Sequence, residues 1–228
     1  MSADVTRKAL IVWGGWDGHQ PQQVAEIFEK ALIEKGFEVE VSDTLDAYLD
    51  EEKLKGLDLI VPVWTMGSIS GEQLKPLLEA VKSGVGIGGC HGGMCDSFRN
   101  ETEYQLMTGG QWISHPGNDG TEYDVRITDP NHFITEGSPI VFKVKSEQYY
   151  MHTDPSNKVL ATTPFPVADG PHVKNGAFEM PVIWTRYYGE GRVYYNSLGH
   201  QANIVDQEEV LPLMVRGLLW AAHAEDAI

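Results

Sequence analysis

The chain has 228 residues, of which 42% are hydrophobic and 22% are charged, so it is long enough for one large globular domain. Its 17 basic and 33 acidic residues give a formal net charge of −16. Acidic groups cannot neutralise phosphates, and this composition therefore argues against nucleic acid or an anionic membrane as partner.

The start of the chain is polar, and its first apolar run, Ala9 to Trp13, is too short to cross a bilayer. The two cysteines, Cys90 and Cys95, neither make a disulfide framework nor have C-x-x-C spacing. We therefore expect a cytoplasmic protein.

The first half of the chain alternates strand and helix patterns. Apolar or alternating runs predict strands over 9–13, 37–41, 57–64 and 85–90, although Pro62 is unusual for a central strand. Helical spacing predicts helices over 24–36, over 70–83, and from the glycine-rich turn through Tyr104 to about residue 108. This order is typical of an α/β protein with a doubly wound, mostly parallel sheet.

The second half is richer in strands, predicted over 123–127, 140–144, 158–162, 181–184 and 192–196, with a hairpin turn at 188–191. A final helix is predicted over 208–223. Because no internal repeat, low-complexity tract or linker divides the sequence, we expect a single domain over 1–228.

Parallel α/β sheets bind ligands beyond the carboxyl ends of their strands, where the winding direction reverses. Three strand ends of the first half should therefore meet in one crevice. Their side chains are mainly polar and aromatic, namely Trp16 and His19, Trp64, Thr65 and Met66, and Cys90 and His91.

The glycine-rich turn Gly88–Gly93 admits two registers. In the first, Cys90 takes the nucleophile position of a G-x-X-x-G elbow, which suits thiolate attack. In the second, His91 takes the tip as an exposed, neutral imidazole that can act as a base or a ligand. A packing turn with an inert cysteine is the structural alternative.

Two later segments also carry candidate chemistry. Glu147, Tyr149, His152 and Asp154 lie close together in the sequence and offer a base, a ligand and a stacking ring, although a solvated loop fits as well. A strand that ends in Asn196–His200 places another histidine at a carboxyl end. His115, which precedes a proline, suits a loop or a site equally.

Several histidines directed at one crevice raise the prospect of a divalent metal such as zinc, which readily takes histidine and carboxylate ligands. The sequence has no H-x-x-x-H or H-E-x-x-H spacing, so the ligands would come from separate loops. The candidate ligands are His91, His152 and His200.

The order of several motifs resembles the ThuA-like family of trehalose utilisation over about residues 8–222. These motifs are Gly15-Trp16-x-Gly18-His19-x-Pro21, Gly89-Cys90-His91-Gly92-Gly93-Met94, His115-Pro116-Gly117, Glu147-Gln148-Tyr149-Tyr150-Met151-His152 and Asn196-Ser197-Leu198-Gly199-His200. The family belongs to the class I glutamine amidotransferase-like superfamily, and the resemblance therefore implies a flavodoxin-like three-layer α/β sandwich.

The resemblance does not extend to glutaminase chemistry. Glutaminases of that superfamily have a late His-Pro-Glu, whereas His200 is followed here by Gln201-Ala202. ThuA-like relatives generally place histidine at the elbow, which favours the His91 register. Without a relay from nucleophile through histidine to carboxylate, acyl transfer from glutamine has no mechanism.

We therefore expect a sugar-modifying enzyme (isomerase, lyase or hydrolase) that acts on a small carbohydrate or keto-sugar with acid–base or metal-assisted chemistry. The expected catalytic residues are His91, His200, Glu147 and His152. The expected substrate-binding residues are Trp16, His19, Trp64, Cys90, His115, Tyr149 and Asp154. The alternatives are a non-catalytic sugar-binding or regulatory module and, less favoured, a Cys90-dependent amidotransferase or hydrolase. A homo-oligomer is expected from the superfamily.

Overall fold

The computed structural model describes residues 6–228, so the first five residues of the expected domain lie outside the described part. A nine-stranded sheet has the order β2-β1-β3-β4-β11-β10-β9-β6-β7, and a separate two-stranded ribbon pairs β5 with β8. The strands are β1 Lys8–Gly15, β2 Glu38–Ser42, β3 Leu59–Thr65, β4 Gly86–Cys90, β5 Gly110–Ser114, β6 Thr121–Ile127, β7 Val141–Ser146, β8 Tyr150–Thr153, β9 Lys158–Phe165, β10 Phe178–Tyr188 and β11 Gly191–Asn196.

The sheet has a parallel and an antiparallel half. Strands β2, β1, β3, β4 and β11 run parallel, and β10, β9, β6 and β7 extend the sheet with antiparallel pairs. Because β1 lies between β2 and β3, the winding direction reverses beside it. The predicted α/β class is confirmed, and Pro62 is accommodated in the interior of β3 opposite Val12.

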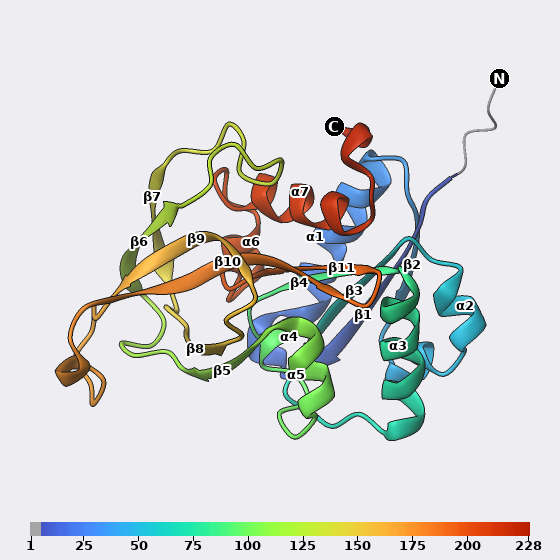
Figure 1. Ribbon diagram of the computed structural model, residues 1–228, viewed down its shortest axis with the longest axis horizontal. Coiled ribbons are helices and arrows are strands. Elements are labelled where there is room, and N and C mark those ends of the chain that lie inside the picture. The colour runs from blue at the N-terminus through green and yellow to red at the C-terminus, as the bar shows by residue number, and fades with distance from the viewer. Residues whose placement is uncertain (1–5) are drawn as a thin grey trace.

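Helices cover both faces of the sheet (Figure 1). They are α1 Pro21–Glu34, α2 Glu51–Lys55, α3 Gly71–Ser83, α4 Gly92–Cys95, α5 Thr102–Thr108, α6 Ala202–Val205 and α7 Leu211–Ala221. One hydrophobic cluster packs α1 and α7 against the sheet, and a second packs α3, α4 and α5 against the opposite face. This is the predicted three-layer sandwich.

Two predicted helices differ from the structure. The helix expected after the glycine-rich turn is divided into α4 and α5, because Phe98 has a positive φ of 48° and Ser97 forms a bridge with Met66. The final helix begins at Leu211 instead of residue 208, with Pro212 in its first turn, where a missing N–H is tolerated.

Within residues 6–228, no helix is both long and apolar enough to cross a membrane.

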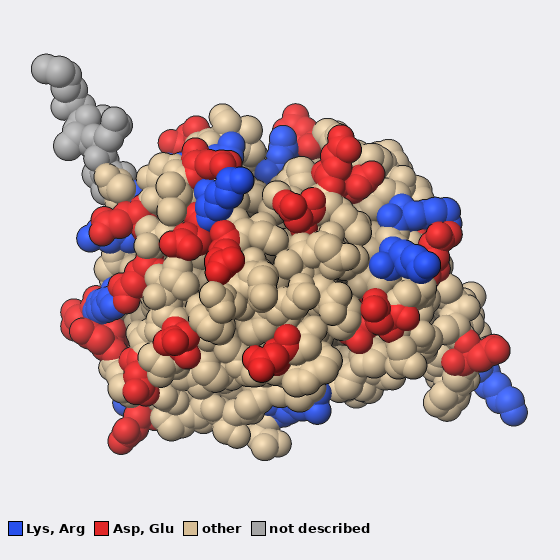
Figure 2. Space-filling view, turned by 180° about the vertical axis from the view of Figure 1, so that it is seen from behind, with Lys and Arg blue, Asp and Glu red and all other residues tan. Residues whose placement is uncertain are grey.

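The surface reflects the acidic composition. On the face shown in Figure 2, acidic side chains are spread widely, and the basic side chains lie singly or in small groups among them. No broad basic surface is visible on this face, as expected for a net charge of −16.

Candidate functional site

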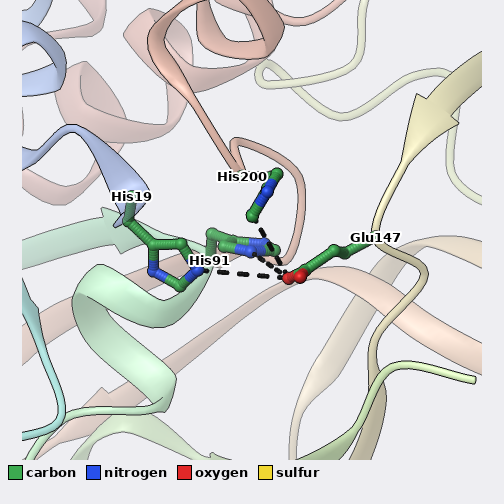
Figure 3. A group of neighbouring side chains, drawn as sticks. All are labelled: His19, His91, Glu147 and His200. Carbon is green, nitrogen blue, oxygen red and sulfur yellow. Dashed lines mark hydrogen bonds and ion pairs between the residues drawn. The ribbon is translucent and has the colours of Figure 1, made fainter. Parts of the chain in front are cut away.

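Four buried side chains meet beyond the carboxyl ends of the parallel strands: His19, His91, Glu147 and His200 (Figure 3). His19 follows β1, His91 follows β4, Glu147 follows β7, and His200 follows β11. One ligand atom from each lies within 4.8 Å of the others. The predicted convergence of strand ends therefore occurs, and it brings together residues from distant parts of the chain.

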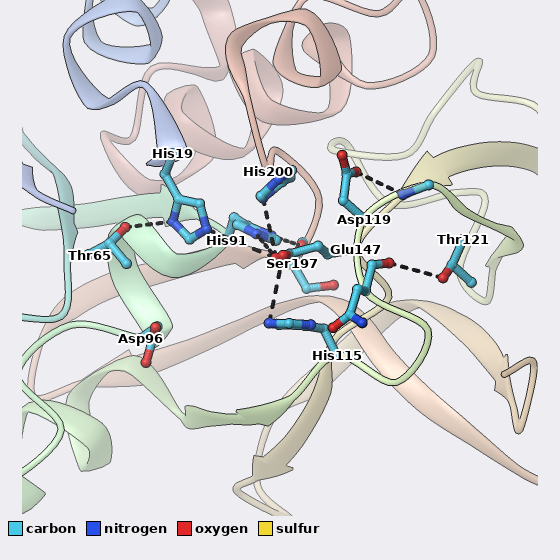
Figure 4. A network of polar contacts seen from close by, with 12 residues as sticks. His19, Thr65, His91, Asp96, His115, Asp119, Thr121, Glu147, Ser197 and His200 are labelled. Atoms are coloured by element: carbon cyan, nitrogen blue, oxygen red, sulfur yellow. Dashed lines mark hydrogen bonds and ion pairs between the residues drawn. The ribbon is translucent and has the colours of Figure 1, made fainter. Parts of the chain in front are cut away.

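Glu147 is the common partner in this histidine–glutamate cluster. Its Oε2 lies 3.2 Å from His91 Nε2, 3.2 Å from His200 Nδ1 and 4.0 Å from His19 Nε2. Its other oxygen, Oε1, lies 3.7 Å from Nε2 of His115. Glu147 thus separates three buried imidazoles from a fourth that is partly exposed (Figure 4).

The backbone at His91 is strained, with φ 48° and ψ −139°. A non-glycine residue keeps such angles only where its surroundings enforce them. Its N–H donates to the Asn196 carbonyl at 2.8 Å, and its own carbonyl accepts from the Tyr195 hydroxyl at 3.0 Å. Of the two registers, the structure therefore has His91 at the tip of the elbow.

Gly92 lets a second histidine approach this elbow. A Cβ at Gly92 would lie 2.6 Å from Cε1 of His19 and 3.0 Å from the methyl group of Thr65. Any side chain here would therefore push His19 away from His91. The glycine is required for close approach.

Hydrogen bonds fix how two of the imidazoles present their nitrogens. His91 Nδ1 lies 2.8 Å from the carbonyl oxygen of Ser197, which can only accept, so Nδ1 carries the hydrogen. Neutral His91 therefore turns the lone pair of Nε2 toward Glu147. His19 Nδ1 lies 2.8 Å from the Thr65 hydroxyl, and this contact sets the orientation of its ring.

This arrangement suits a cation. Burial, followed by repulsion from His91 and His200, lowers the pKa of His19 to about 3, and burial also lowers the pKa of His91. Both imidazoles are then neutral, and His91 turns its Nε2 lone pair toward the carboxylate. Burial opposes ionisation of Glu147, but its contacts with His200 and His91 hold the pKa of the carboxyl well below its usual range.

His200 Nδ1 is buried and has no hydrogen-bond partner, although it lies near Glu147. Unpartnered nitrogen atoms directed at a carboxylate are what a divalent metal with histidine and carboxylate ligands requires. The residues present therefore fit such an ion. Of the three metal ligands expected from the sequence, His91 and His200 lie in this cluster.

His152 is not brought to the cluster. Alternation along β8 leaves it exposed, opposite Gln111 of β5. Asp154 also lies elsewhere, since its carboxylate accepts from Ser156 and lies 3.4 Å from Arg186. His152 and Asp154 are close to Glu147 in the sequence, but they do not lie with it in the cluster.

The expected aromatic residues take different positions. The Tyr149 ring stacks on His91 with centroids 3.8 Å apart, and Trp16 meets His19 edge-on at 4.8 Å while remaining 47% exposed. Trp64 is partly buried and packs against the second hydrophobic cluster. Tyr149 and Trp16 thus contact the cluster directly.

Cys90 lies in the hydrophobic core beneath the loop that carries His200. Burial raises the pKa of its thiol to about 12, so the reactive thiolate is absent near neutral pH. A Cβ at Gly199, which has φ +106°, would lie 3.1 Å from the Cys90 sulfur. Cys90 therefore supports the loop by packing.

The exposed side of the cluster is bounded by a wall of side chains that the sequence did not predict as part of the site. Arg99 lies over the Trp112 ring at 4.7 Å, and it forms two hydrogen bonds to Asp96, at 2.6 and 2.9 Å. The Trp112 and His115 rings are 5.5 Å apart. The Asp96–Arg99 pair is local in the sequence, whereas the contact between Arg99 and Trp112 depends on where β5 lies.

Comparisons with known proteins agree with this fold. The sequence profile of the ThuA family, described as trehalose utilisation, matches residues 8–221. No curated protein matches the chain significantly. Among solved structures, a putative ThuA-like protein from Bacteroides uniformis has a TM-score of 0.77 and 19% identity, covering 97% of this chain and 94% of that one.

A second putative ThuA-like protein, from Parabacteroides merdae, has a TM-score of 0.69 and 20% identity, covering 95% of this chain and 90% of that one. A β-galactosidase from Bacillus circulans sp. alkalophilus has a TM-score of 0.62 and 11% identity, and 98% of this chain matches 31% of that enzyme. These likenesses concern the fold. On the profile match, which covers nearly the whole chain, the protein belongs to the ThuA family.

Proposed function

We propose that this protein is a metal-dependent enzyme of carbohydrate catabolism that acts on a small sugar or keto-sugar. The observation that carries the proposal is the gathering of three imidazoles around the Glu147 carboxylate in a buried site. The family's description, trehalose utilisation, supports a sugar as the substrate class.

His19, His91, His200 and Glu147 would hold the metal. Zinc fits this donor set, and when bound it supplies Lewis-acid polarisation of an oxygen atom of the substrate. The Ser197 carbonyl and the Thr65 hydroxyl orient two of the ligand rings. Burial of all four side chains excludes bulk water and strengthens their electrostatic effect.

We assign proton transfer to the partly exposed side of the cluster, where Glu147 faces His115. Glu147 Oε1 and His115 Nε2 lie 3.7 Å apart, and the His115 side chain is 30% exposed. A substrate that reaches this side would meet the ionised Glu147 carboxylate, which can accept a hydrogen bond, and the His115 imidazole, which can accept or donate a proton. The Tyr149 ring, stacked on His91, keeps the imidazole in place.

The experiment is to measure zinc content and turnover together. The protein purified with zinc should contain about one ion per chain and convert a member of a panel of neutral sugars and keto-sugars. His91→Ala and His200→Ala should each lose the ion and lower kcat/KM by about 100-fold or more. His152→Ala, which changes an exposed histidine outside the cluster, should retain both properties.

Two results would contradict the proposal. Full activity in both cluster variants would remove the assigned role of the histidines. Binding of sugars without any product across the panel would favour a sugar-binding or regulatory module.

The cytoplasmic location expected from the sequence belongs to the same proposal, and a structurally similar Salmonella typhimurium protein is described as cytoplasmic.

A further inference from the structure

The wall on the exposed side of the cluster is built by the β5–β8 ribbon. Trp112 on β5 pairs with Met151 on β8, and Glu147 and Tyr149 lie just before β8. One ribbon therefore sets the distance between Trp112 and the Glu147 carboxylate. The wall comprises Trp112, His115, Arg99 and Asp96.

A register irregularity brings the two rings of this wall together. In a regular strand, residues three apart point to opposite faces. The β5–β8 pairing is shifted between Trp112 and Ser114, and the rings of Trp112 and His115 lie 5.5 Å apart with a tilt of 36°. Irregularities of this kind often redirect side chains beside active sites.

Both rings carry a buried nitrogen without a partner. Trp112 Nε1 and His115 Nδ1 are inaccessible and make no hydrogen bond. A buried polar atom left unpaired is costly, and such atoms are usually satisfied by water or a ligand. Two of them lie on neighbouring rings beside the histidine–glutamate cluster, and hydroxyl groups of a bound molecule would satisfy them if the side chains that cover them move aside.

Trp112 is held rigidly for such a role. Arg99 lies 4.7 Å from the centre of its ring, and both oxygens of Asp96 hold the Arg99 guanidinium. Because Asp96 neutralises Arg99, the wall offers no surplus positive charge to a phosphate or carboxylate. The net charge of −16 further disfavours an anionic ligand.

We propose that Trp112 and His115 form a subsite that holds an uncharged, polyhydroxylated ring against the histidine–glutamate cluster, with the Asp96–Arg99 pair positioning Trp112. This inference rests on the proposed function and specifies the ligand that it takes. A phosphorylated or acidic sugar would be excluded.

The test measures sugar binding by calorimetry, with and without zinc, using glucose, trehalose and trehalose 6-phosphate as probes. Trp112→Phe keeps a ring under Arg99 but removes the N–H, and it should weaken binding of the neutral sugars about 3- to 10-fold. His115→Gln should have an effect of similar size. Arg99→Gln should weaken sugar binding while zinc affinity stays unchanged.

Matched controls come from outside the wall. Trp220 also lies under an arginine, Arg192, which pairs with Glu225, so Trp220→Phe changes the same kind of contact far from the cluster. His152→Gln changes an exposed histidine on the same ribbon. Neither variant should alter the affinity for sugar. Melting temperatures show whether each variant is folded.

Wild-type affinity in both Trp112→Phe and His115→Gln would overturn the inference, and so would tighter binding of trehalose 6-phosphate than of trehalose. A wild-type protein that binds neither neutral sugar would also overturn it, since the unpaired nitrogens would then hold only water. Failure of the proposed function gives a different result: no zinc is bound, although sugar binding remains measurable.

Discussion

The two ends of the parallel strands differ in how their polar groups are paired. At the amino ends, contacts join opposite charges or a donor with an acceptor: Arg192 pairs with Glu225 at 2.6 Å, and the Lys8 N–H donates to Asp58 at 2.7 Å. At the carboxyl ends, three imidazoles surround one carboxylate, and neutral His91 cannot donate to it, because its Nδ1 hydrogen is bonded to the Ser197 carbonyl. The amino-end contacts join groups that pair with each other, although the buried Nε of Arg192 has no partner, whereas the carboxyl ends gather the ligand atoms of four side chains around one point.

The largest effect expected from this comparison comes from Thr65, whose hydroxyl contacts His19 at 2.8 Å. Thr65→Val keeps the shape of the side chain but removes the hydroxyl, and it should lower zinc affinity about 10- to 100-fold, as loss of a group that orients a ligand does. Competition with a chelator of known affinity measures the change.

Two further variants sharpen this prediction. Thr65→Ser restores the hydroxyl and should recover most of the affinity. Thr185→Val changes a buried threonine in the middle of the sheet, on β10, and it should leave zinc affinity unaltered. Equal affinities for Thr65→Val and Thr185→Val would mean that the Thr65 hydroxyl does not orient His19 for zinc.

A smaller effect is expected on the pH dependence of stability. The pKa of His19 is lowered to about 3, whereas the ordinary value is 6.5. Below 6.5 the unfolded chain takes up a proton on this residue that the folded protein does not. The contribution is therefore fully favourable above pH 6.5 and declines as the pH falls toward 3.

His19→Gln removes this titration from the metal-free protein. The stability of the wild type relative to the variant should therefore decrease between about pH 7.5 and about pH 5. Urea unfolding at both pH values measures the difference, with His152→Gln as the exposed control. A wild type that gained stability relative to His19→Gln on acidification would contradict the assignment of a neutral, buried imidazole.

The smallest effect is expected for Cys90→Ala. With a thiol pKa raised to about 12 by burial, Cys90 cannot supply a thiolate at neutral pH. The rate should change by less than about threefold, because the cysteine supports the His200 loop only by packing. A loss as large as that of His91→Ala would instead restore a thiol mechanism.

The sequence predicted the fold and part of the site for a shared reason. Apolar runs and glycine-rich ends mark parallel strands, and topology alone brings the ends of β1, β4 and β11 together. His19, His91 and His200 could therefore be named as site residues from their places at strand ends. His19 was expected to bind substrate, whereas its nitrogen lies among the candidate metal ligands.

What the sequence did not predict depends on short-range geometry. His152 and Asp154 were grouped with Glu147 because they are near it in the chain, but β8 begins at Tyr150 and its alternation turns His152 outward. The Arg99–Trp112 contact joins α4's following loop to a five-residue strand whose pairing has no strong sequence signal. Such contacts follow from register, which local patterns do not determine.

The position of β11 between β4 and β10 has a consequence for how the protein is made. This strand is central in the sheet but late in the chain, and the loop after it carries His200. During synthesis, β4 can pair with β3 early, but it can pair with β11 only after β11 has been made. His200, the last residue of the cluster, is added at the same step. Metal capture would then occur only after β11 and the His200 loop have been synthesised, so a bound ion would report that this central strand is in place.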